Sequence, residues 1–128
     1  AAAGEPRLKA CIANCGPYDW GAVLPTLPAV TQETFRVRSH SSSIAEAHER
    51  ARAITLEGRA QQIKCPTLVI FGAGDRLISP AEGRRLADTV SGPCDYVVYE
   101  EGNHVCFNIS SKFRTLTADW MKEKLGAA

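Results

Sequence analysis

An aspartate and a histidine each follow an apolar run of the sequence, at the point where a buried strand should end. Asp75 comes directly after TLVIFGAG, and His104 comes directly after YVVYEEGN. A carboxylate can hold an imidazole in one tautomer and stabilise its charged form, while the other ring nitrogen takes a proton from a hydroxyl. The two residues therefore predict an orienting acid and a general base.

Such a pair needs parallel strands behind it, because the loops after the carboxyl ends of parallel strands converge on one crevice. Segment 67–71 (TLVIF) is apolar without alternation, which is typical of a strand buried on both faces. Segment 96–99 (YVVY) predicts a second strand, and segment 8–14 (LKACIAN), which Gly16 and Pro17 end, predicts a third. We expect about three parallel strands.

Helices are expected between and after these strands. Ser79 is placed as an N-cap before Pro80, and Ser43 with Glu46 forms a capping box at the start of another helix. Segment 56–63 is amphipathic, and Ser110 begins a last amphipathic helix. Strands that alternate with helices favour an α/β fold with a parallel sheet.

An irregular stretch follows the first expected strand. Residues 17–55 include Pro25 and Pro28, which rule out one long helix at the start of this stretch. We interpret 17–55 as a lid-like insertion in a single partial domain that covers 1–128, and 56–128 as its catalytic end. Asp19 and Trp20 are candidates for the lining of a substrate pocket.

The motif I-x-x-P-T-L-V-I-x-G-x-x-D, followed by E-G-x-H, resembles the closing segment of the α/β-hydrolases. It begins at Ile63, reaches Asp75, and resumes from Glu101 to His104. In that family the triad follows the chain order Ser, then Asp or Glu, then His, which Asp75 and His104 match. The opening AAAGEPRLKACIANCGPYDW is similar to the segment after the nucleophile helix in the esterase and carbon–carbon hydrolase branch that includes 2,6-dihydropseudooxynicotine hydrolase.

The resemblance implies the C-terminal part of an α/β-hydrolase fold, with parallel strands flanked by helices and a small lid. It also implies a parent enzyme that hydrolyses a small ester, or a bond between carbons beside a ketone-type carbonyl, through an acyl-enzyme. The sequence contains no G-x-S-x-G, so the nucleophile and the oxyanion donors are expected upstream of this chain. Alone, the chain should be inactive or nearly so.

Other interpretations remain open. Cys15, at the end of the first expected strand, could act as a nucleophile with His104 as its base, although no strained elbow precedes it. The chain could also be a non-catalytic binding or assembly module that has kept the site residues. In either case, the open edge of the first strand should associate with the missing N-terminal half or with a second copy.

The composition excludes several other functions. Lysine plus arginine number 15 against 14 acidic residues, so the net charge of +1 gives no field for nucleic acid or an anionic membrane. With no long apolar run and no signal-peptide pattern at its start, the chain is expected in the cytoplasm. The five cysteines show no metal-ligand spacing, so no metal site is predicted. Gly72 and Gly74 lack the third glycine of a dinucleotide motif, so no other cofactor is predicted either.

Overall fold

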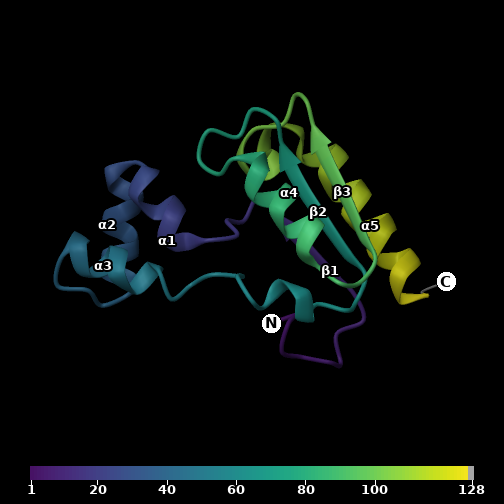
Figure 1. The fold of residues 1–128 in the computed structure, drawn as a ribbon. Coiled ribbons are helices and arrows are strands. Elements are labelled where there is room, and N and C mark those ends of the chain that lie inside the picture. Colours follow the sequence, from purple (N-terminus) through teal and green to yellow (C-terminus); the bar gives the residue numbers. More distant parts are fainter. Residues whose placement is uncertain (127–128) are drawn as a thin grey trace. The chain divides into compact units, whose positions relative to one another are not determined.

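Three parallel strands form the sheet of this protein in a computed structural model that describes residues 1–126 (Figure 1). They are β1 (Cys11–Asn14), β2 (Thr67–Gly72) and β3 (Cys94–Tyr99). Their order in the sheet is β1-β2-β3, so β2 lies between the other two. The predicted α/β fold with a parallel sheet is confirmed.

The helices alternate with the strands along the chain. The α-helices are α1 (Trp20–Val23), α2 (Ala29–Arg38), α3 (Ile44–Ala51), α4 (Pro80–Thr89) and α5 (Ser110–Leu125). The 3-10 helices are η1 (Leu24–Thr26), η2 (Ala60–Gln62) and η3 (His104–Ile109), and η3 is kinked at Val105 and Cys106, where the backbone is not helical. None of the helices within residues 1–126 combines the length and the apolar character of a membrane span.

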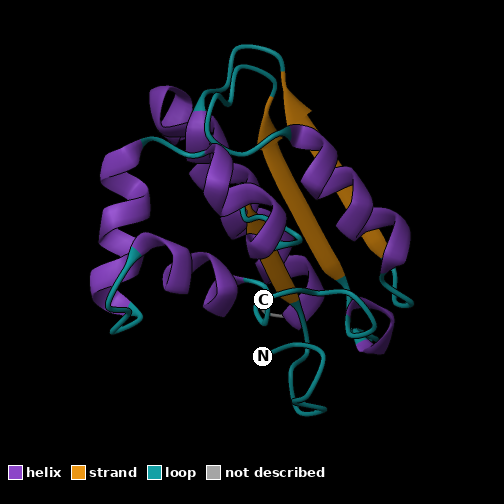
Figure 2. Ribbon diagram, turned by 60° about the vertical axis from the view of Figure 1, so that its left-hand side comes forward, coloured by secondary structure: helices purple, strands orange, loops and turns teal. Residues whose placement is uncertain are grey.

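The central strand β2 is buried on both faces, as its unbroken apolar sequence predicts. Leu68 and Ile70 belong to the same core cluster as Trp120 of α5. Phe71 points to the other face, where its ring meets Gly83 of α4. Figure 2 shows helices on both sides of the strands. Each face of β2 is therefore covered by a helix.

The expected element boundaries need three corrections. The first strand begins at Cys11 and not at residue 8, because the amide of Cys11 donates to the carbonyl of Pro66, where the neighbouring strand starts. The third begins at Cys94, two residues earlier than expected, since the amide of Thr67 pairs with the carbonyl of Pro93 beside it. Segment 56–63 contains only the short η2, and Gly58 before it has a positive φ of 69° that interrupts a helix.

Both predicted helix caps are present. The hydroxyl of Ser79 accepts a hydrogen bond from the amide of Ala81 at 3.2 Å. The hydroxyl of Ser43 accepts from the amide of Glu46 at 3.1 Å. The carboxylate of Glu46 reaches back to the amide of Ser42 at 2.7 Å, one residue before the position that a capping box uses.

The chain divides into two compact units. One consists of the residues up to Gly16 and those from Gly58 onward, and it contains the sheet with α4 and α5. The other is Pro17–Glu57, which holds α1, α2 and α3 and is closed by an antiparallel bridge between Asp19 and Thr55. That residues 17–55, which fall in this unit, act as a lid stays a prediction.

Replacement of Gly83 by alanine should lower the free energy of unfolding. A Cβ at this position would lie 2.2 Å from Cε2 of Phe71, whose side chain is 1% exposed and cannot move away easily. We expect a net loss of about 1–3 kcal/mol from overpacking, even though alanine favours a helix over glycine by about 1 kcal/mol. Urea unfolding of the variant measures this loss.

Two further variants serve as controls for this measurement. Phe71→Leu in the Gly83→Ala chain should recover part of the loss, because it removes the ring that the new methyl group meets. Gly4→Ala should change little, since nothing lies within 4 Å of a Cβ there. An unchanged urea midpoint for Gly83→Ala would contradict the close packing of α4 on β2.

Candidate active site

The loops that follow β2 and β3 meet backbone to backbone. A Cβ on Gly72 would lie 2.4 Å from the carbonyl carbon and oxygen of Gly102. The amide of Gly74 donates to the carbonyl of Gly102 at 2.9 Å, and the amide of Ala73 donates to the carbonyl of Tyr99 at 2.9 Å. Only residues without a side chain permit this approach, so the glycines bring the two loops together.

The two loops bring Asp75 and His104 into direct contact, as the sequence predicts. Nδ1 of His104 lies 2.9 Å from Oδ2 of Asp75. The other carboxylate oxygen, Oδ1, accepts hydrogen bonds from the backbone amides of Leu77 and Ile78, both at 2.9 Å. One oxygen is therefore fixed to its own loop, and the second is presented to the imidazole.

The environment of Asp75 keeps its carboxyl charged. Burial raises its pKa, because the side chain is entirely inaccessible to solvent, but hydrogen bonds from the amide of Ile78, from His104 and from the amide of Leu77 outweigh that effect. The pKa of Asp75 therefore lies below its ordinary value. Since a carboxylate can only accept hydrogen bonds, Nδ1 of His104 carries the proton that is shared with Asp75.

The imidazole of His104 is more accessible than its partner, with 37% of its side chain exposed. With the proton on Nδ1, its Nε2 presents a lone pair that can accept a proton from a hydroxyl. A buried carboxylate behind a partly exposed imidazole is the arrangement that an orienting acid and a general base require.

The loop that carries His104 contains contacts that the sequence does not reveal. Asn108 accepts a hydrogen bond from the amide of Asn103 at 2.9 Å and donates to the carbonyl of Glu101 at 2.7 Å. The side chain of Asn14, in β1, donates to the carbonyl of Val105 at 3.4 Å. No spacing rule predicts either asparagine, because each is defined by a loop conformation and not by periodicity.

Cys15 lies at the end of β1, where the sequence allowed it as an alternative nucleophile. It is buried, with 3% of its surface exposed. Burial raises the pKa of the Cys15 thiol to about 11, although hydrogen bonding with the backbone of Gly72 and Val105 opposes this rise. Because the thiolate is the nucleophilic form, a thiol that stays protonated at neutral pH is poorly suited to this role.

Asp19 and Trp20 belong to the unit Pro17–Glu57. Asp19 caps α1, and its Oδ1 accepts hydrogen bonds from the amides of Gly21 at 2.8 Å and Ala22 at 3.3 Å. The ring of Trp20 packs against Phe35 at a centroid distance of 5.7 Å and lines a small hollow with Ile54 and Leu56. Their place in a substrate pocket stays a prediction.

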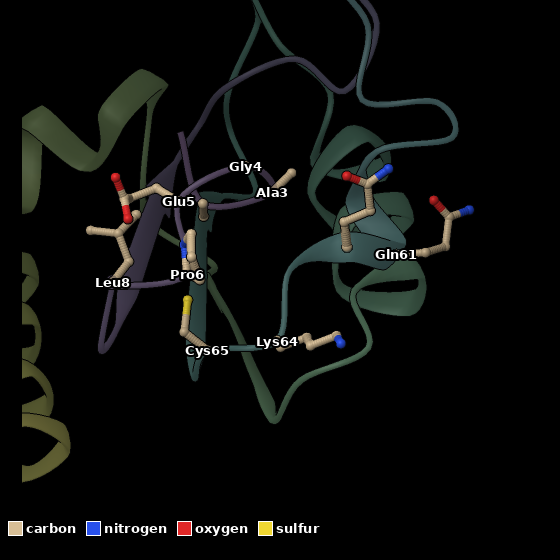
Figure 3. A pocket seen from close by; sticks show the side chains of 10 residues that line it. Ala3, Gly4, Glu5, Pro6, Leu8, Gln61, Lys64 and Cys65 are labelled. Carbon is tan, nitrogen blue, oxygen red and sulfur yellow. The ribbon is translucent and has the colours of Figure 1, made fainter.

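A hollow of about 500 Å³ lies at the other end of the strands from Asp75 and His104. Figure 3 shows the side chains that line it, among them Leu8, Gln61 and Cys65. Among its lining residues, Leu8 precedes β1 and Cys65 precedes β2, so it opens at the amino ends of the strands. Asp75 and His104 follow the carboxyl ends of β2 and β3. This hollow is therefore separate from the candidate active site.

The described part of the chain offers no ready-made metal site. Within residues 1–126, no group of three or more His, Cys, Asp or Glu side chains is arranged so that it could hold a metal ion. The five cysteines are free thiols.

No protein-family model matches the chain. Among characterised proteins, it is 32% identical to the 2,6-dihydropseudooxynicotine hydrolase of Paenarthrobacter nicotinovorans, over 98% of this chain and 34% of that protein. The crystal structure of a 2,6-dihydroxy-pseudo-oxynicotine hydrolase matches 97% of this chain with a TM-score of 0.89 and 28% identity. This match covers 35% of that structure, so the chain spans about a third of these relatives.

A second solved structure has the same fold at lower identity. Acetyl xylan esterase 1 from Thermoanaerobacterium sp. JW/SL YS485 matches 96% of this chain and 40% of its own length, with a TM-score of 0.69 and 19% identity. The three parallel strands and their flanking helices correspond to part of such a hydrolase fold. The chain is therefore a relative of the α/β-hydrolases and carries part of their fold.

Proposed function

We propose that this chain supplies the acid and the general base of a serine-hydrolase triad. The observation that carries the proposal is the 2.9 Å hydrogen bond between Nδ1 of His104 and the buried carboxylate of Asp75. The position of both residues after the carboxyl ends of adjacent parallel strands supports it, as does the likeness to a hydrolase that is 32% identical. The proposed reaction is hydrolysis of an ester, or of a carbon–carbon bond beside a carbonyl.

The proposed mechanism begins with proton transfer to His104. A serine from outside this chain gives its hydroxyl proton to Nε2 while its oxygen bonds to the carbonyl carbon of the substrate. The imidazolium, which Asp75 stabilises through Nδ1, then protonates the departing alkoxide or carbanion, and an acyl-enzyme remains. Water, deprotonated by the same Nε2, attacks the acyl carbon and releases the acid and the serine.

The open edge of β1 is the proposed place of assembly. In the sheet of the described residues, β1 pairs only with β2, so its outer backbone groups remain available for another strand. We propose that this edge pairs with the segment that bears the nucleophile, or with a second copy of the chain. The proposed location of the assembled enzyme is the cytoplasm.

The 128-residue chain by itself should show almost no esterase activity. Loss of the nucleophile of a serine hydrolase costs about a millionfold in turnover, and this chain contains no G-x-S-x-G. Hydrolysis of p-nitrophenyl acetate by the purified chain should therefore stay near the rate that free imidazole produces. Turnover at the level of an enzyme would contradict the need for an external serine.

The second test compares Asp75→Asn with Asp75→Ala in a polypeptide that joins this chain to a nucleophile-bearing segment. Asparagine keeps an oxygen for the amides of Leu77 and Ile78 but turns an NH₂ group toward Nδ1 of His104. The wrong imidazole tautomer should then lower kcat by about 10⁴-fold, with little change in stability. Alanine should also lose about 1–3 kcal/mol of unfolding free energy, because both amides lose their acceptor.

Kinetics and urea unfolding of the two variants measure these effects separately. If Asp75→Asn kept the activity of the unsubstituted protein, Asp75 would not be the triad acid. If, in addition, His104→Ala left a measurable binding or assembly property intact, the chain would be better described as a non-catalytic module derived from this fold.

A further inference from the structure

The residue after His104 adopts a backbone conformation that its side chain disfavours. Val105 has φ 53° and ψ 19°, and Cys106 follows with φ 54° and ψ 30°. The left-handed region is unfavourable for a β-branched residue and persists only where surrounding contacts hold it. The position of the imidazole depends on this turn, because His104 immediately precedes it.

The side chain of Asn14, the last residue of β1, holds one backbone polar group of Val105. Its amide donates to the Val105 carbonyl at 3.4 Å. We refer to this contact between Asn14 and Val105 as the β1 clamp.

The clamp is itself anchored to the strand that leads to Asp75. The backbone amide of Cys15 donates to the carbonyl of Ile70 at 2.9 Å. The thiol of Cys15, the residue after Asn14, donates to the same carbonyl at 3.6 Å. The β1 clamp therefore ties the turn after His104 to the strand that carries the acid.

Stability alone does not account for an asparagine at position 14. Its Oδ1 is buried and has no hydrogen-bond partner among the described residues. The amide cannot be turned around, because Nδ2 must face the Val105 carbonyl. A buried oxygen without a donor lowers the free energy of unfolding. An apolar residue at position 14 would not carry this cost, but it could not donate to the Val105 carbonyl.

We propose that Asn14 is a positioning residue for His104, which acts through the carbonyl of Val105. The inference rests on the proposed role of Asp75 and His104. Without Asn14, the turn relaxes toward negative φ, and the imidazole leaves the carboxylate of Asp75. The protein stays folded, because the contact removed contributes little to the core.

Nitrogen-15 NMR of the imidazole tests this in the 128-residue chain without any activity assay. In the unsubstituted chain, His104 should show the tautomer with the proton on Nδ1 and a downfield proton signal from its bond to Asp75. In Asn14→Ala, the population of this state should fall by about fivefold, the change that release of a modest backbone strain produces. The urea midpoint of the variant should stay close to that of the unsubstituted chain.

A variant at Val105 identifies the cause of this loss. Glycine adopts the left-handed region freely, so Val105→Gly should remove the need for the clamp. Asn14→Ala combined with Val105→Gly should therefore keep more of the Nδ1–H signal than Asn14→Ala alone. An equal loss in both chains would overturn the assignment of Asn14 as a residue that acts through the Val105 turn.

The remaining outcomes separate this inference from the proposed function. An unchanged His104 signal in a folded Asn14→Ala chain overturns the positioning role and leaves the acid and base roles intact. Absence of the Nδ1–H state in the unsubstituted chain would instead contradict the proposed function itself. If Asn14→Ala does not fold, Asn14→Leu takes its place, because leucine keeps the volume and removes the donor, and an unchanged signal in that folded chain overturns the clamp.

Discussion

The backbone at Gly72 passes so close to the backbone at Gly102 that a Cβ on the first would lie 2.4 Å from the carbonyl of the second. This approach joins the end of β2 to the loop after β3, and two hydrogen bonds from Ala73 and Gly74 keep the loops together. The carboxylate of Asp75 and the imidazole of His104 lie 2.9 Å apart because the backbones of the two loops that carry them are in direct contact. The absence of a Cβ at Gly72 and Gly102 thus permits the loop approach that sets the distance between Asp75 and His104.

The same constraint explains how a fully buried carboxylate remains charged. Burial alone would raise the pKa of Asp75, since it penalises the charged form. The tight turn after Gly72 directs the amides of Leu77 and Ile78 to one carboxylate oxygen, and the Gly102 loop brings the imidazole to the other. Three donors thus replace the water that the carboxylate has lost, and its pKa lies below the ordinary value.

The sequence predicts the elements of this site better than it predicts their supports. Strand β2 is recognisable because its apolar run has no alternation, and Ser79 marks the start of α4 because capping is local chemistry. The first residues of β1 and β3 are set by pairing with the neighbouring strand and not by composition. The start predicted from sequence therefore differs from the observed start by three residues for β1 and by two for β3. Asn14 was missed for a related reason, since its contact with Val105 joins residues 91 positions apart.

Asp75 and His104 organise one another within a single compact unit of the chain. Every contact that orients Asp75 and His104 comes from the strand ends of β1, β2 and β3 or from the loops directly after them. A hydroxyl that reaches Nε2 from another strand would therefore meet an imidazole whose tautomer and direction are already set. This preorganisation lowers stability at two residues beside the site. The backbone of Val105 is strained, and Oδ1 of Asn14 is buried without a hydrogen-bond partner among the described residues. The sheet that surrounds them, with both faces of β2 covered by helices, supplies the stability that makes such local costs tolerable.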